Sequence, residues 1–190
     1  VELDPKDEVY LLNAAQACFN AGLLEASVQH AKRVIEINHA SELAYQMLTR
    51  ALTRMHRHAE VLDFMSGMPE ELRHTVEYWV GFGLASQASG RPNEAIKAYM
   101  SALEIKLDDA TVHYRMGLSF YDLKLKEEAA ECFRTALALG LGSYTLHALG
   151  LLVYAERERC RWAVAADDWA QINQVLNSMT VGTAAPAAVF

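Results

Sequence analysis

The stretch from Trp79 to Leu107, WVGFGLASQASGRPNEAIKAYMSALEIKL, forms one unit, and the residues after it repeat the same pattern. Small and large side chains recur 34 residues later, with Gly83 matched by Gly117, Ala95 by Ala129, Tyr99 by Phe133, Ala102 by Ala136 and Leu103 by Leu137. A fixed internal period is the signature of an architecture in which each unit packs on its neighbours.

The spacing inside this unit predicts two helices joined by a short turn. Large residues fall three and four apart in each half, which gives one apolar stripe per helix. Gly90 and Pro92 break the chain between the halves, and Pro92 suits the first turn of the second helix. Gly83 lies inside the first helix, where glycine costs about 0.5–1 kcal/mol relative to alanine. We therefore expect Gly83 and Gly117 to lie where the partner helix approaches closely, with Ala95 and Ala129 as the matching small surface.

These positions resemble the tetratricopeptide repeat, whose two helices carry aromatic, glycine and alanine residues at set places. The first copy supplies Trp79, Phe82, Gly83, Ser86, Ala95, Tyr99 and Ala102, and the second supplies His113, Met116, Gly117, Phe120, Ala129, Phe133 and Ala136. The resemblance implies an all-α solenoid, a right-handed superhelix of helix hairpins. It also implies that the first helix of each unit lines a concave, partner-binding side.

The same period divides the whole chain. Residues 1–6 read as the end of a preceding repeat, which suggests a longer array, and residues 7–41 as unit one. Residues 42–74 form a degenerate second unit, with His56 at a glycine position and a second helix that ends near Gly67-Met68-Pro69. Residues 75–109 and 110–142 are units three and four. Residues 143–179 read as a partial repeat opened by Gly150 and closed by capping helices, and residues 180–190 as a linker or frayed tail.

Composition narrows the class of protein. The net charge of −7 argues against a nucleic-acid groove and against binding to an anionic membrane. Residues 136–155 carry no formal charge, but a turn at Gly140-Leu141-Gly142 and the continued repeat pattern disfavour a membrane span. Three scattered cysteines form no disulfide framework and fit a reducing, cytoplasmic location.

No catalytic constellation, cofactor motif or metal site is evident, so an enzymatic role would need residues outside this chain. His56 and His58 form the closest histidine pair, but they lie in a polar turn without a third ligand. Cys18, Cys132 and Cys160 fit small buried apolar residues better than nucleophiles.

Binding of a protein or extended peptide is the stronger prediction. Residues of the first helices that lie off the packing stripe should face the concave side, where amides can pair with a peptide backbone and arginines with carboxylates. The predicted partner-binding residues are Asn13, Gln16, Phe19, Asn20, Gln46, Arg50, Arg54, Gln87, Tyr114, Arg115 and Tyr121. Met47, Thr53, Val80 and Leu84 occupy the same face.

A second resemblance concerns the C-terminal segment. Cys160-Arg161-Trp162, followed by a helix and Pro186, is similar to the segment after the repeats of O-linked N-acetylglucosamine transferases, with Arg161 in place of the usual acid. It implies that the chain is the substrate-recruiting, non-catalytic arm of a protein O-glycosyltransferase. The alternative is a stand-alone adaptor for assembling a protein complex. The asparagine ladder of those transferases is matched only by Asn13, and the asparagine and basic clamp of chaperone-binding repeats is absent.

Overall fold

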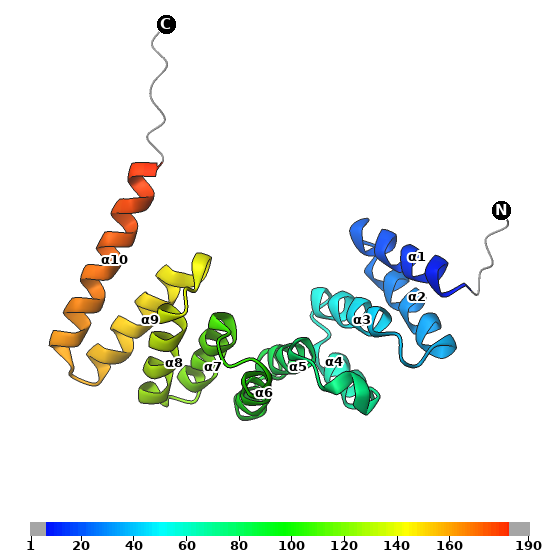
Figure 1. Cartoon of the computed structure of the whole chain (residues 1–190), viewed down its shortest axis with the longest axis horizontal. Helices are drawn as coiled ribbons and strands as arrows, with labels where there is room; N and C mark the ends of the chain where they lie inside the picture. The colour runs from blue at the N-terminus through cyan, green and yellow to red at the C-terminus, as the bar shows by residue number, and fades with distance from the viewer. Residues whose placement is uncertain (1–6, 183–190) are drawn as a thin grey trace, which may run out of the picture. The chain divides into compact units, whose positions relative to one another are not determined.

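The computed structural model describes residues 7–182, and the whole of this part is helical or turn, without a β-strand. The residues predicted to end a preceding repeat, 1–6, lie outside it, as do residues 183–190 of the predicted tail. The helices are α1 (Glu8–Asn20), α2 (Leu24–Ile37), α3 (Glu42–Arg54), α4 (His58–Ser66), α5 (Val76–Ala88), α6 (Pro92–Ile105), α7 (Ala110–Asp122), α8 (Lys126–Ala138), α9 (Thr145–Glu158) and α10 (Trp162–Gly182), with short 3₁₀ helices η1 (Glu70–Arg73) and η2 (Gly142–Tyr144) (Figure 1). The predicted all-α fold is confirmed.

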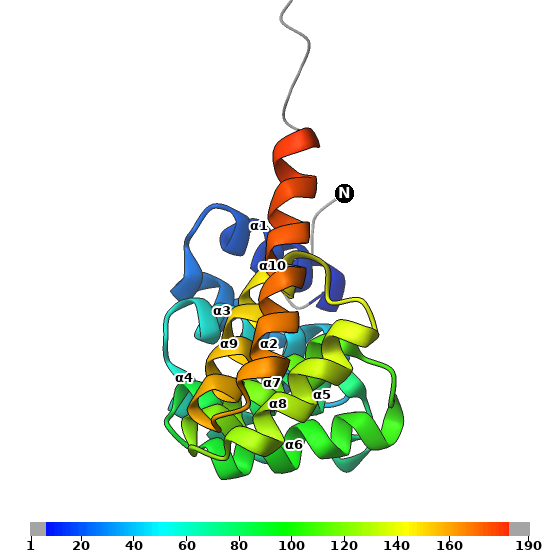
Figure 2. The ribbon, with the colours of Figure 1, turned by 90° about the vertical axis from the view of Figure 1, so that its left-hand side faces the viewer.

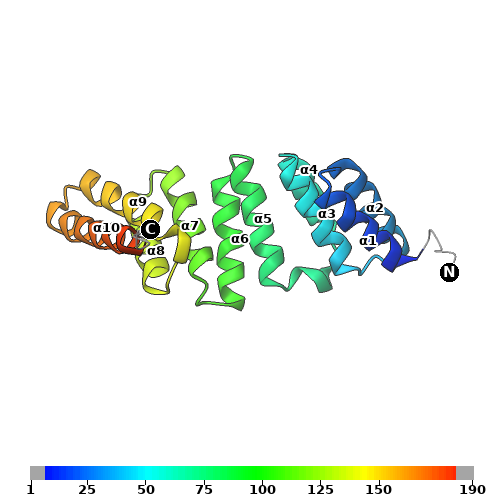
Figure 3. The ribbon, with the colours of Figure 1, turned by 90° about the horizontal axis from the view of Figure 1, so that it is seen from above.

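The chain divides into two compact units, Val1–Ile105 and Lys106–Phe190. Unit 1 holds three hairpins, α1–α2, α3–α4 and α5–α6, and α3 packs on α2 as α5 packs on α4 (Figure 3). Unit 2 holds the hairpins α7–α8 and α9–α10, with α9 packed on α8. The handedness predicted for the superhelix concerns both units together and stays a prediction.

Every hairpin turns in the same way. A backbone N–H donates to the carbonyl five residues earlier, in the pairs Leu23 to Cys18, Arg57 to Leu52, Arg91 to Ser86, Leu125 to Phe120 and Arg161 to Glu156. The residue before each donor has a positive φ: 78° at Gly22, 58° at His56, 71° at Gly90, 65° at Lys124 and 58° at Cys160. His56, Lys124 and Cys160 therefore hold a left-handed conformation that glycine adopts more easily. The turns fix the alignment of all five hairpins.

Gly83 and Gly117 lie inside their hairpins, as predicted. A Cβ added to Gly83 would come within 2.5 Å of the Tyr99 ring, and one added to Gly117 within 2.7 Å of the Phe133 ring. Both rings are completely buried. The predicted complementary surface is corrected, because the aromatic rings of the second helix, and not Ala95 or Ala129, are the nearest groups.

The second hairpin is shortened where the sequence predicted it. Helix α4 has 9 residues, compared with 14 in α2 and α6, and ends at Ser66 shortly before Pro69. The chain then continues into η1, and the Tyr78 hydroxyl of α5 donates to the carbonyl of Met65 at 3.2 Å. This hydrogen bond and the burial of Met65 and Met68 fasten the short helix to the next hairpin.

The fifth hairpin departs from the predicted alignment. Its turn residue Cys160 follows Lys124 by 36 positions, whereas the earlier turns are 34 apart. The extra residues lie between α8 and α9, so Val153 occupies the place of Gly117 and Gly150 is displaced. Gly150 is exposed, and a Cβ added to it would meet no atom within 4 Å. Gly150, predicted from the sequence to open the fifth unit, is therefore not a position of close helix packing.

Helix α10, orange to red in Figure 2, is the longest helix among the described residues. It continues to Gly182, past the start of the segment predicted as a linker. Ile172 packs against α9, but Trp162 and Trp169 are 60% and 54% exposed. The exposed residues of this helix are mixed, because Trp162 and Trp169 are accompanied by Asp167, Gln171 and Gln174.

Residues 136–155, the uncharged run noted in the sequence, span the end of α8, a turn with η2 and most of α9. Among the described residues, no helix is both long and apolar enough to cross a membrane.

Candidate functional site

A groove of about 620 Å³ crosses the first helices of unit 1. Its walls come from α1, α3 and α5, and α4 contributes part of the floor. The lining residues are Phe19, Gln46, Thr49, Arg50, Thr53, Arg54, Val61, Met65, Glu77, Val80, Gly81 and Leu84. Phe19, Gln46, Arg50 and Arg54 from the predicted set are thus brought together, with Thr53, Val80 and Leu84 beside them.

Two arginines stand over one aromatic ring at the edge of this groove. The guanidinium carbons of Arg50 and Arg54 lie 4.8 Å and 5.2 Å from the centre of the Phe19 ring. Arg54 also donates to the carbonyl of Phe19 at 3.4 Å. Among the described residues, neither arginine has a carboxylate within ion-pair distance. Helical spacing explains their proximity, because residues four apart share a face of α3.

The floor of the groove is apolar. Val61 and Met65 are buried, and α5 packs closely over Met65 at Gly81, where an added Cβ would lie 3.4 Å from the Met65 methyl. Val61 and Met65 were not predicted as groove residues, because only the first helices were assigned to the concave side. Thr49 and Glu77 lie on first helices and were also missed. The shortness of α4 was visible in the sequence, but its contribution to the floor required the packing of α4 beneath α5.

Three of the predicted amide side chains already have hydrogen-bond partners, on the same helix for Gln16 and Gln46 and on the next helix for Gln87. Gln16 donates to the Asn20 side chain at 2.7 Å, and Gln46 donates to Glu42 at 2.9 Å. Gln87 accepts from the Tyr99 hydroxyl at 3.3 Å. A peptide backbone would have to compete with these contacts, so the arginines are the better candidate ligands.

Several predicted residues lie elsewhere. Asn13, Gln16, Asn20 and Gln87 are in unit 1 but do not line the groove. Met47 is buried, so its side chain does not reach the groove surface.

In unit 2, the assignment of Tyr114 to an exposed face is corrected. It is 5% exposed, stacks on Tyr144 and hydrogen-bonds to His147 at 2.5 Å. A large aromatic ring at this position is more stable inside the helix layer. Tyr121 packs edge-on against Tyr154 at 6.1 Å, and Arg115 is half-buried with its Nε enclosed.

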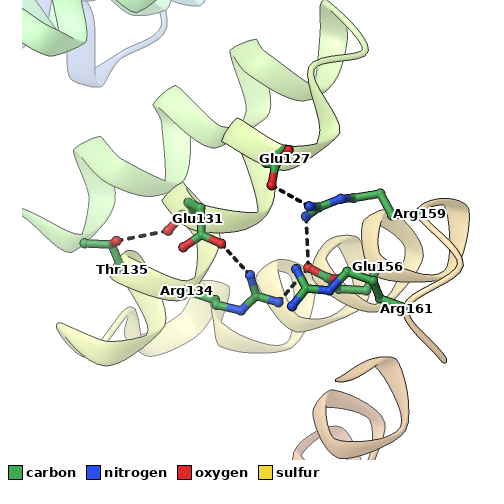
Figure 4. A network of polar contacts seen from close by, with 7 residues as sticks. All are labelled: Glu127, Glu131, Arg134, Thr135, Glu156, Arg159 and Arg161. Carbon is green, nitrogen blue, oxygen red and sulfur yellow. Dashed lines mark hydrogen bonds and ion pairs between the residues drawn. The ribbon is translucent and has the colours of Figure 1, made fainter. Parts of the chain in front are cut away.

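Unit 2 contains a buried polar cluster, drawn in Figure 4. The Glu156 carboxylate is fully buried and pairs with Arg134 at 2.6 Å, Arg161 at 3.3 Å and Arg159 at 3.5 Å. Arg159 also reaches Glu127, and Arg134 reaches Glu131. The cluster joins α8, α9 and the turn before α10. The arginine charges are matched by glutamates, which makes this cluster a structural connection.

Asp168 lies beside this cluster and is 7% exposed, with its Oδ2 atom enclosed. Burial raises the pKa of its carboxyl above the ordinary value, helped by the charges of Glu156 and Asp167 and opposed by Arg134 and Arg161. The desolvation of a carboxylate explains the direction.

The remaining reactive side chains do not assemble a site. Burial raises the pKa of Cys132 to about 11, so it is a protonated thiol at neutral pH. Cys160 is exposed in its left-handed turn, which corrects its predicted burial. Within residues 7–182, no group of three or more histidine, cysteine, aspartate or glutamate side chains is placed to hold a metal ion.

Two known families of repeats match parts of this chain. A family described as TPR repeat matches residues 83–124, and one described as Tetratricopeptide repeat matches residues 110–139. No curated protein sequence matches the chain. Tetratricopeptide repeats are therefore present in this part of the sequence.

Solved structures agree with the fold. A MamA crystal structure superposes with a TM-score of 0.83 at 13% identity, over 94% of this chain and 96% of the other. MamA from Desulfovibrio magneticus RS-1 superposes with a TM-score of 0.81 at 15% sequence identity, over 92% of this chain and 97% of the other. YrrB, described as a TPR protein with an unusual peptide-binding site, superposes with a TM-score of 0.71 at 14% sequence identity, over 90% of this chain and 88% of the other. The fold class is thus an all-α solenoid of tetratricopeptide hairpins.

Proposed function

We propose that this chain is a protein-binding module whose unit 1 groove holds an extended segment of a partner with an acidic residue. The observation that carries the proposal is the pair Arg50 and Arg54, for which the described part of the chain supplies no carboxylate within ion-pair distance, although the net charge is −7. A guanidinium pairs with a carboxylate through two parallel hydrogen bonds, which gives both strength and orientation.

The apolar floor supplies the second half of the recognition. A side chain inserted over Val61, Met65 and Leu84 would bury apolar surface beside the charged pair. Glu77 at the α5 wall disfavours an acidic residue at that side. The acidic residue of the segment should therefore lie at the α1–α3 side, which gives the segment a direction.

The experiment uses a peptide array in which each acidic twelve-residue peptide has a partner with Asp and Glu changed to Asn and Gln. Binding of the chain to labelled hits is then measured by fluorescence polarisation. The acidic member should bind about tenfold tighter, because a hydrogen bond to a charged group contributes ~1.5–3 kcal/mol. Arg50→Gln with Arg54→Gln should remove the difference, while the exposed control Arg33→Gln should keep it. Equal binding of both peptides by the native chain would contradict the proposal.

A second question is whether this module belongs to an enzyme or acts as a stand-alone adaptor. The hypothesis that the chain is an arm of a protein O-glycosyltransferase depends on the segment Cys160-Arg161-Trp162. Two of these residues have local structural roles, because Cys160 forms the turn and Arg161 pairs with Glu156. A stand-alone adaptor requires only the groove, so we favour it. The gene sequence beyond the codon for Phe190 separates the two: nucleotide-sugar-binding lobes would support the arm.

A further inference from the structure

The groove of unit 1 is joined by a second, smaller hollow of about 50 Å³. The residues that line both are Gln46, Thr49, Met65 and Glu77. The hollow lies between the first turns of α3 and α5, where Glu42 and Glu77 stand, whereas Arg50 and Arg54 belong to the second half of α3. The groove and the hollow therefore form one continuous surface with carboxylates at one end and guanidinium groups at the other.

The walls of the hollow are mainly apolar and firmly packed. They are formed by Tyr45, Met65, Met68, Leu72 and Tyr78. All of these except Leu72 are at most 7% exposed. The Tyr78 hydroxyl is already engaged, because it donates to the carbonyl of Met65 at 3.2 Å. Such a narrow space suits an unbranched aliphatic stem, and the stem of a lysine packs along apolar surface while its charged end stays in water.

The mouth of the hollow is negatively charged. Glu42 and Glu77 both line it, and both are exposed. Among the described residues, neither glutamate has a basic side chain within ion-pair distance. Glu42 accepts a hydrogen bond from the Gln46 amide at 2.9 Å, which leaves its charge uncompensated. An apolar hollow with two carboxylates at its mouth is complementary to a basic residue.

The length of α3 between the two charged ends sets a spacing for the bound segment. Glu42 and Arg50 are eight residues apart on this helix, which corresponds to a rise of about 12 Å. An extended segment advances about 3.3 Å per residue. Two opposite charges about four residues apart would therefore reach both ends at once. A segment with its charges in the reverse order would place like charges together, and such repulsion gives specificity.

We propose that the partner segment carries a basic residue about four residues from its acidic residue. The stem of the basic residue enters the hollow, and its charge pairs with Glu42 and Glu77. This assignment rests on the proposed function, because the acidic residue must lie at Arg50 and Arg54. It narrows the partner from any acidic segment to one with two opposite charges at a set spacing and in one order along its chain.

The test starts from the acidic twelve-residue peptide that the native chain binds most tightly, with its other charged residues replaced by amides. Lysine is placed in turn at each position from two to six residues on either side of the acidic residue, and binding is measured by fluorescence polarisation. One position, about four residues away and on one side only, should tighten binding by about fivefold, as for a favourable exposed ion pair. Norleucine there keeps the stem without the charge and should give a smaller gain.

Glu42→Gln with Glu77→Gln should bind the lysine and norleucine peptides equally, while the exposed control Glu36→Gln should still prefer lysine. Circular dichroism checks the helices, because carboxylates in a first turn also stabilise a helix. Equal gains from lysine at every position would overturn the basic anchor, since they indicate general attraction to an acidic chain.

A lysine gain that survives in the double glutamine variant would overturn it as well. In both cases the native chain can still prefer acidic peptides over their amide partners, so the proposed function would stand. If the native chain shows no such preference, the proposed function and the basic anchor fail together.

Discussion

The hairpins α7–α8 and α9–α10 of unit 2 turn through the same hydrogen bond and yet bury different amounts of their aromatic residues. Phe133 is completely buried against Gly117, whereas Trp169 at the equivalent place is 54% exposed and faces Val153. Two extra residues before α9 account for the change, because they shift a branched side chain into the glycine position. A conserved turn geometry therefore does not guarantee a conserved interior, and a shift in register converts a core position into surface.

The largest expected effect compares the two aromatic residues directly. Phe133→Ala should lower the free energy of unfolding by about 3–5 kcal/mol, since it removes a fully buried ring. Trp169→Ala should cost less than about 1 kcal/mol, as for a substitution at the surface. Urea unfolding followed by circular dichroism measures both, and equal costs would break the comparison.

The glycine of the regular hairpin gives the next effect. Gly117→Leu should cost about 1–3 kcal/mol, because the added side chain overlaps the Phe133 ring and the hairpin must open. Thermal melting with calorimetry checks this expectation. A variant that melts with the native chain would show that the Phe133 ring can move aside without cost.

Substitution of the displaced glycine, Gly150, should change the stability of the chain in the opposite direction. Gly150→Ala should stabilise the chain by about 0.5–1 kcal/mol, because the helix gains propensity and the new methyl group meets no neighbouring atom. Gly117→Ala is the matched control and should destabilise. If both alanines destabilise, Gly150 lies in a closer contact than its exposed position indicates.

The smallest effect concerns pH. The raised pKa of Asp168 means that folding favours its protonated form, so stability should increase as pH falls through that pKa toward the ordinary aspartate value. Asp168→Asn should therefore be more stable than the native chain at neutral pH, and the difference should close as the pH falls. Denaturant unfolding at several pH values measures this, with the exposed Asp167→Asn as control. A constant difference would assign the effect to packing.

Much of the fold was predictable because repetition multiplies the signal. Gly83 with Tyr99 and Gly117 with Phe133 repeat at one spacing, and each copy supports the interpretation of the other. His56 could be placed in the glycine position of the turn by spacing alone. The alignment of the fifth hairpin could not, because Gly150 offered a plausible but incorrect match, and only the turn at Cys160 identifies the register.

The groove was predictable in part. Arg50 and Arg54 were identified because a helix puts residues four apart on one face. Tyr114 was placed on the wrong side, since the same spacing allows a ring to point outward or into the neighbouring hairpin. Met65 was missed because its contribution depends on how a shortened helix packs beneath α5.

The sequence by itself determined the helix hairpins, their turns and the close approach at Gly83 and Gly117, because these depend on local propensity and on a period that each unit repeats. Only the tertiary structure decided which side chains line the groove, which carboxylates are buried beside arginines and which tryptophans stay exposed. Those outcomes depend on contacts between helices that are distant in the chain, and the register of one connection is enough to change them.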